Sequence, residues 1–121
     1  MAKKIVLVDD EPDILRTLEI FLKSEGFNVL TATDGIKALD IIRASRPDLI
    51  VLDIMLPKLD GYKICRILKF DERYKKIPIV VFTARAQELD EKKAKEVKAD
   101  AYITKPFHPD ALLDKIKELL G

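Results

Sequence analysis

The sequence has little of the side-chain chemistry that binds zinc or forms disulfide bonds. Its 121 residues include one cysteine and one histidine. Cys65 has no second thiol in the chain with which to form a disulfide, and Cys65 and His108 alone are too few to build a zinc site. Because Cys65 falls within a helical pattern of apolar residues, we predict that it is a core residue.

The sequence also lacks an excess of charge of either sign. Lysine and arginine number 22 and aspartate and glutamate 21, which gives a formal net charge of +1 at pH 7. A chain so nearly neutral has no overall basic field to hold nucleic acid or an anionic membrane. We therefore expect no direct nucleic-acid binding and no membrane association.

Long apolar runs are missing as well. No stretch is long enough to span a bilayer, and Lys3 and Lys4 lead only into a short apolar run, unlike a secretory signal peptide. We therefore predict a cytoplasmic protein. A chain of 121 residues with 48% hydrophobic content has the size of one domain, and we predict a single domain over residues 1–121.

What the sequence does contain is a regular alternation of two apolar patterns. Short unbroken runs rich in valine and isoleucine suit strands that are covered on both faces, as in a parallel sheet between helices. These runs are Ile5 to Val8, Val29–Leu30, Leu49 to Leu52, Ile79 to Phe82 and Ala101 to Ile103. Apolar residues at helical spacing lie between and after them, in the segments Ile14 to Leu22, Ala38 to Ile42, Ile64 to Leu68, Gln87 to Lys98 and Leu112 to Leu120. The alternation predicts an open, doubly wound α/β sheet.

Polar side chains stand where four of the strand-like runs end. They are Asp9 and Asp10 after the first run, Asp53 after the third, Thr83 after the fourth and Lys105 after the fifth. In an open α/β sheet the ligand site lies beyond the carboxyl ends of the strands, where the strand order reverses. For the order 2-1-3-4-5 that point lies between strands one and three. Each residue alone would be explained as an ordinary helix-end, loop, strand-end or surface residue. Their convergence on one edge of the sheet predicts a site instead.

The charge of this group indicates a metal. Three carboxylates with one ammonium leave a local net charge of about −2, which one divalent cation with oxygen ligands would neutralise. Mg²⁺ fits best, with Mn²⁺ as an alternative, because Mg²⁺ takes one or two carboxylates, keeps several waters and accepts phosphate oxygens. We give Glu11 only the role of opposing the positive end of the helix that follows it. The sequence thus predicts a metal site that handles phosphate.

Four segments, "VDDEPD", "VLDIMLPKLDGY", "FTAR" and "AYITKPF", resemble in their order and spacing the receiver domain of bacterial two-component response regulators. The similarity extends over essentially the whole chain. The resemblance implies a flavodoxin-like α/β domain with a five-stranded parallel sheet of order 2-1-3-4-5 and five helices on both faces. It also implies a phosphoacceptor signalling domain that is not a turnover enzyme, catalyses its own phosphorylation and dephosphorylation, and has a sensor histidine kinase as its partner.

The resemblance further implies roles for residues that match the family's motifs. Asp53 would be phosphorylated. The Mg²⁺ ligands would be the side chains of Asp10 and Asp53, the backbone carbonyl of Met55 and, through water, Asp9. The phosphoryl oxygens would contact Thr83, the backbone N–H of Ala84 and Lys105. The switch residues would be Thr83 and Tyr102, and a cis peptide bond would join Lys105 to Pro106.

The family also implies how the signal leaves the domain. Output would use the surface made by the fourth helix, the fifth strand and the fifth helix, and the downstream partner stays open. Receivers that dimerise often carry an acidic residue before the switch aromatic, where this chain has Ala101. We therefore expect a monomer when the chain is unphosphorylated.

Two other classes of protein share parts of this pattern. Phosphatases of the haloacid-dehalogenase type also use an aspartate nucleophile with Mg²⁺, but they normally carry a second aspartate two residues later, where this chain has Met55. A flavin-binding module of flavodoxin type needs hydroxyls and backbone amides in its first loop, where this chain has three carboxylates. The phosphatase remains the alternative hypothesis.

Overall fold

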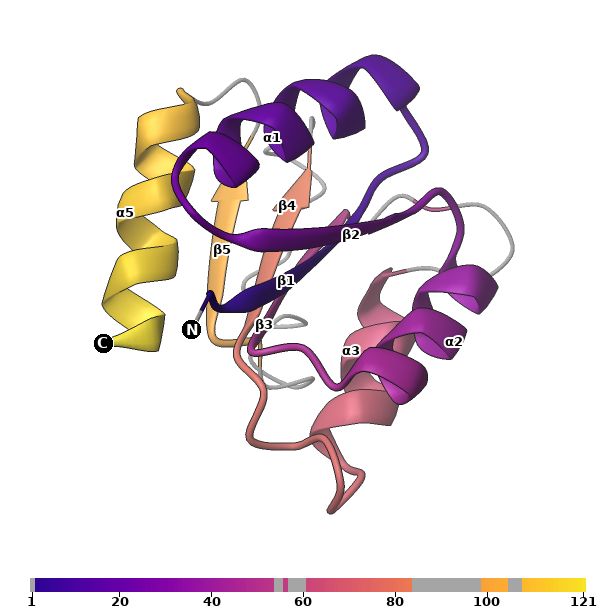
Figure 1. Cartoon of the computed structure of the whole chain (residues 1–121). Coiled ribbons are helices and arrows are strands. Elements are labelled where there is room, and N and C mark those ends of the chain that lie inside the picture. The colour runs from indigo at the N-terminus through magenta and orange to yellow at the C-terminus, as the bar shows by residue number, and fades with distance from the viewer. Residues whose placement is uncertain (1, 54–55, 57–60, 84–98, 105–107) are drawn as a thin grey trace.

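The computed structural model describes residues 2–53, 56, 61–83, 99–104 and 108–121, with Thr83, Tyr102 and Thr104 described in their backbone alone (Figure 1). In chain order the elements are β1 (Lys4–Val8), α1 (Pro12–Ser24), β2 (Asn28–Ala32), α2 (Gly35–Ser45), β3 (Leu49–Asp53), α3 (Gly61–Lys69), β4 (Ile79–Thr83), β5 (Ala101–Thr104) and α5 (Pro109–Leu120).

The strands form one five-stranded sheet in the order β2-β1-β3-β4-β5, and every neighbouring pair is parallel. This is the order that the resemblance implies. Each strand is longer than the apolar run that predicted it, most clearly β2, where Val29–Leu30 is the centre of Asn28–Ala32. The ladder explains the difference, because pairing with β1 satisfies the backbone of Asn28 and Thr31 whatever their side chains are.

Helices cover both faces of the sheet (Figure 1). On one face α1 and α5 pack over alternate strand residues, so that Ile5 and Leu7 share a buried cluster with Leu18 and Leu112. On the other face α2 and α3 do the same. The unbroken apolar runs therefore belong to strands that are buried from both sides, as the composition predicts.

The number of helices is confirmed only in part. The described residues contain four, and the predicted helix over Gln87 to Lys98 lies outside them, so the fifth helix stays a prediction. Among the residues described, no helix has the length and apolar character needed to cross a membrane.

The helices that leave the carboxyl ends of β1 and β2 begin differently. Pro12 is the first residue of α1, after an N-cap residue, Glu11, whose side chain makes no capping hydrogen bond. Asp34 caps α2, because its Oδ1 accepts the backbone N–H of Lys37 at 2.9 Å. At the other end of α1, Gly26 has a φ of 95°, a conformation that glycine adopts at little cost and that turns the chain into β2.

Candidate functional site

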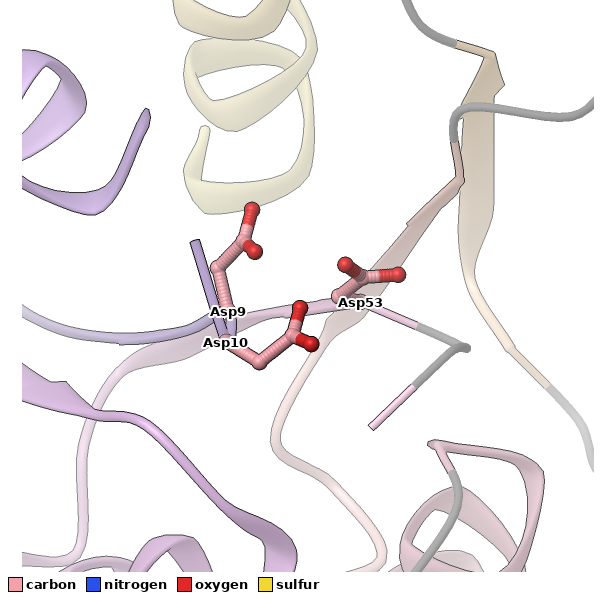
Figure 2. Close-up of side chains that lie close together, drawn as sticks. All are labelled: Asp9, Asp10 and Asp53. Atoms are coloured by element: carbon pink, nitrogen blue, oxygen red, sulfur yellow. The ribbon is translucent and has the colours of Figure 1, made fainter. Parts of the chain in front are cut away.

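The site is built where β1 and β3 end side by side. Val8 pairs with Leu52 in the parallel ladder, so the next residues, Asp9 and Asp53, emerge at the same edge of the sheet. Asp10 follows Asp9 before α1 begins. One carboxylate oxygen from each of the three aspartates lies within 4.8 Å of the others (Figure 2). The sheet order thus brings together three acidic residues that are 44 positions apart in the chain at their widest.

Asp9 is held in place by the backbone around it. Its own N–H donates to the carbonyl oxygen of Ala32 at 3.2 Å, which continues the pairing of β1 with β2 by one residue. Its Oδ1 accepts the backbone N–H of Glu11 at 2.9 Å, one of the N–H groups at the start of α1 that have no partner within the helix. Glu11 therefore meets Asp9 through its backbone and leaves its own carboxylate exposed beside the helix N-terminus.

The three carboxylates differ in their access to solvent. Asp9 and Asp53 are buried, with 0% and 4% of their surface exposed, whereas Asp10 is exposed. Two buried carboxylates and a third within 4.8 Å repel one another in the ionised state. A divalent cation bound among them would remove that repulsion.

This donor set fits Mg²⁺. It offers hard oxygen ligands, and the exposure of Asp10 leaves one side of the group open to the waters that Mg²⁺ retains. Zinc prefers thiols and imidazoles, but the group found among the described residues consists of carboxylates; neither Cys65, which is buried in the core with α3, nor His108, the N-cap of α5, belongs to it. The predicted ligands Asp9, Asp10 and Asp53 are thus found together.

The other predicted site residues are placed only in part. The backbone of Thr83 ends β4, next to β3, in which Asp53 pairs with Phe82. Tyr102 lies in β5 opposite Val81. The remaining predictions, which concern Met55, Ala84, Lys105 and Pro106 and include the cis peptide bond, fall outside the described residues.

Two buried residues, one beside the site and one at the opposite edge of the sheet, were not predicted from the sequence. Leu56 is buried, with 9% exposed, in the core cluster that includes Val8 and Leu52, although it belongs to the connection between β3 and α3. Lys69 is also buried, with 8% exposed. Its position four residues after Cys65, on the apolar face of α3, is the one sequence signal that could have revealed it.

With this geometry in place, the class of protein can be stated. The chain belongs to the response regulator receiver domain family, whose model matches residues 5–117. It is a receiver domain of two-component systems. Receiver domains are signalling domains and not classical enzymes.

Individual relatives agree with this assignment. The chain is 43% identical over 120 residues to the alkaline phosphatase synthesis transcriptional regulatory protein PhoP of Bacillus subtilis (strain 168), a match that covers 99% of this chain and 49% of PhoP. The chain thus spans about half the length of this curated relative.

Solved structures are similar over nearly their whole length. The chemotaxis response regulator CheY4 of Vibrio cholerae is 29% identical with a TM-score of 0.92, and the match covers 99% of this chain and 100% of that one. The receiver domain of sensor histidine kinase PA1611 from Pseudomonas aeruginosa PAO1 is 31% identical with a TM-score of 0.91, covering 100% and 99%. The latter structure is described with a magnesium ion coordinated in its active-site cleft. The phosphatase alternative receives no support from these matches.

Proposed function

We propose that Asp53 accepts a phosphoryl group from a histidine of a sensor kinase, or from a small phosphodonor, in a reaction that requires Mg²⁺. The observation that carries the proposal is the convergence of Asp9, Asp10 and Asp53 within 4.8 Å at the carboxyl edge of the sheet. The magnesium ion described in the cleft of the PA1611 receiver domain supports the choice of metal. Mn²⁺ would serve as a substitute with the same oxygen ligands.

The proposed reaction transfers a phosphoryl group from the donor to a carboxylate oxygen of Asp53. An oxygen of the ionised Asp53 carboxylate forms a bond to phosphorus as the bond from phosphorus to the donor breaks, and the donor leaves with that electron pair. When held by the side chains of Asp10 and Asp53 and the carbonyl of Met55, with Asp9 contacting it through water, Mg²⁺ would neutralise charge on the phosphoryl oxygens. Attack by water on the acyl phosphate later returns the carboxylate and inorganic phosphate.

The residues at the ends of β4 and β5 complete the proposed site. Lys105 contributes a positive charge for the phosphoryl oxygens, while the Thr83 hydroxyl and the N–H of Ala84 donate hydrogen bonds to them. Asp53 needs no general base, because the cation and Lys105 would favour the ionised carboxylate that attacks phosphorus. The chain therefore phosphorylates and dephosphorylates itself without turning over a substrate as an enzyme does.

We further propose that phosphorylation is read by another protein. The output surface would be formed by the 87–98 segment, β5 and α5, with Thr83 and Tyr102 as the switch residues. The name of PhoP describes a transcriptional regulator, but the net charge of +1 favours output through protein contacts over direct nucleic-acid binding by this chain. We propose a cytoplasmic location and a monomer in the unphosphorylated state.

The test of the phosphoacceptor is intact mass spectrometry after incubation with Mg²⁺ and acetyl phosphate. We expect the mass to rise by one phosphoryl group, chelation of Mg²⁺ to abolish the gain, and Asp53→Asn to prevent it. Undiminished labelling of the Asp53→Asn variant would show that another residue is the acceptor.

The metal ligands are tested by substituting the exposed member of the group. Asp10→Ala removes a proposed direct ligand, so Mg²⁺ affinity measured by calorimetry and the rate of phosphorylation should fall together. We expect each to fall by about tenfold or more, since the loss of even an outer-shell partner of a metal ligand typically costs about 10–100-fold in affinity. Asp40→Ala, which removes an exposed aspartate from α2, is the matched control and should change neither. Equal Mg²⁺ affinity in the two variants would remove Asp10 from the ligand set.

A further inference from the structure

A buried ammonium group lies at the amino edge of the sheet, at the opposite end of the strands from the aspartates. Lys69, the last residue of α3, has 6% of its side chain exposed, and its Nζ is 2.6 Å from Oδ2 of Asp100. The same Nζ donates to the carbonyl oxygens of Ile77 at 2.7 Å and Lys75 at 3.2 Å. A lysine ammonium has three N–H groups, and here each has an acceptor.

Asp100 in turn makes two hydrogen bonds to Ile79, the first residue of β4. Its Oδ2 accepts the backbone N–H of Ile79 at 2.8 Å, and its own N–H donates to the carbonyl oxygen of Ile79 at 3.0 Å. Asp100 stands directly before β5, and Ile79 is the first residue of β4. Lys69 therefore holds the residue that starts the pairing of the two strands.

The start of this pairing matters for β5, whose register is otherwise held by its ladder with β4 and by the packing of Ala101 and Ile103 against the core. It is a four-residue strand at the end of the sheet and pairs with β4 alone. The register begins at Val80 opposite Ala101 and ends at Thr83 opposite Thr104. A slip by one residue would move the strand by about 3.3 Å and turn each side chain to the other face. The next residue in the sequence, Lys105, would be displaced with it.

We propose that Lys69 and Asp100 are positioning residues for the phosphorylation reaction: by holding the residue before β5 against the first residue of β4, they fix the register of the strand that Lys105 directly follows in the sequence. This inference rests on the proposed function, in which Lys105 contacts the phosphoryl group. The ion pair joins residues 31 positions apart and lies at the far end of the strands from the reacting carboxylate. Its effect on the reaction is therefore transmitted along the strand.

The test is a double-mutant cycle between Asp100 and Lys105, read as the rate of phosphorylation by acetyl phosphate in saturating Mg²⁺. Asp100→Asn keeps an oxygen that can accept from Ile79 but removes the charge that pairs with Lys69. We expect it to slow phosphorylation roughly tenfold, since small displacements of positioning groups cost one to two orders of magnitude. In a Lys105→Ala background it should slow the reaction by less than about twofold, because the residue being positioned is gone.

A purely structural role predicts a different result. The effects of Asp100→Asn and Lys105→Ala would then multiply, because independent substitutions are additive in free energy, and that outcome would overturn the inference. An unchanged rate in Asp100→Asn would also overturn it. A second variant, Lys69→Met, retains the side chain's length without its charge and should repeat the pattern, with slower phosphorylation that vanishes in the Lys105→Ala background.

Three controls separate this inference from the proposed function. Glu72→Gln breaks the exposed ion pair with Lys75 on the nearby turn and should leave the rate unchanged. Mg²⁺ affinity should be the same in Asp100→Asn as in the parent, because the aspartate group is untouched, while amide hydrogen exchange over Ala101–Thr104 should become faster. If the parent itself gains no phosphoryl group, the proposed function fails. If the parent is phosphorylated and the cycle is multiplicative, only the positioning role fails.

Discussion

At the scale of single residues, burial decides the chemistry of the one cysteine. Cys65 lies in the core with no exposed surface, and this burial raises the pKa of its thiol from 9.0 to about 12. The Lys69 ammonium acts in the opposite direction and the Asp100 carboxylate in the same one, both more weakly than the burial. The prediction from the sequence that Cys65 is a core residue is confirmed.

This shift has a consequence for stability in alkaline solution. Above pH 9 the unfolded chain releases the thiol proton, while the folded chain keeps it until about pH 12. The unfolded state therefore binds fewer protons than the folded state in this window. As a result, the free energy of unfolding falls as the pH rises through it. Urea denaturation at pH 8 and pH 10.5 should show a larger loss in the parent than in Cys65→Ala, which lacks the thiol. A loss of the same size in both proteins would contradict the assignment.

At the scale of elements, the connection from β3 to α3 is tied to the core through Leu56. The connection leaves Asp53, passes Met55 with its proposed metal-binding carbonyl, and has Leu56 packed in the cluster beneath the site. A loop next to a functional group needs such a contact, because its backbone would otherwise be free to move away from the ligand. We therefore expect the packing of Leu56 in the core to influence the proposed metal site.

Truncation of this side chain should affect both stability and metal binding. Leu56→Ala is expected to lower the free energy of unfolding by about 2–4 kcal/mol, the range for a buried leucine that leaves a cavity, and to weaken Mg²⁺ binding. Urea denaturation and calorimetric Mg²⁺ titration measure the two effects. Leu30→Ala on β2, where the side chain is 38% exposed, is the control and should cost less than about 1.5 kcal/mol with unchanged Mg²⁺ affinity. The same Mg²⁺ affinity in Leu56→Ala and the parent would show that the loop holds its position without this contact.

At the scale of the whole molecule, the two ends of the strands carry different groups of charged residues. The carboxyl edge brings Asp9, Asp10 and Asp53 together, and the amino edge holds Lys69 and Asp100. The core between the edges consists of strands buried on both faces, and close-packed interiors transmit displacements instead of absorbing them. We therefore expect a chemical event at one edge to reach the surface proposed for output.

We expect phosphorylation to shift a population of conformations through Tyr102. A Thr83 hydroxyl drawn toward the phosphoryl group would vacate space into which Tyr102 turns, and tyrosine suits two positions because its ring can be buried while its hydroxyl keeps a partner. NMR shifts over residues 88–98 should respond to phosphorylation in the parent and much less in Tyr102→Ala, with both proteins phosphorylated at Asp53. If the two proteins respond equally, Tyr102 is not part of the switch.

The sequence alone was sufficient for the fold class, an open α/β sheet with helices on both faces. Runs such as Ile5 to Val8 are apolar at every position, which only strands covered on both faces require, and helical spacing between the runs supplied the covering layers. It also identified the three aspartates, because polar residues directly after buried strands must emerge at one edge of a parallel sheet. The spacing of apolar residues and the order of the strand-like and helical segments can be seen in the sequence itself, so their prediction does not require the tertiary structure.

The tertiary structure decided what depends on residues distant in the chain. The sequence analysis assigned Lys69 no role, because the pattern of α3 does not show that an ammonium on its apolar face meets Asp100 and two carbonyl groups. The bond from Asp9 to Ala32 and the burial of Leu56 were likewise unforeseen. A buried polar or loop residue is stable only where the folded chain brings partners to it, and which partners arrive is determined by the packing of the sheet and helices, not by the neighbouring sequence.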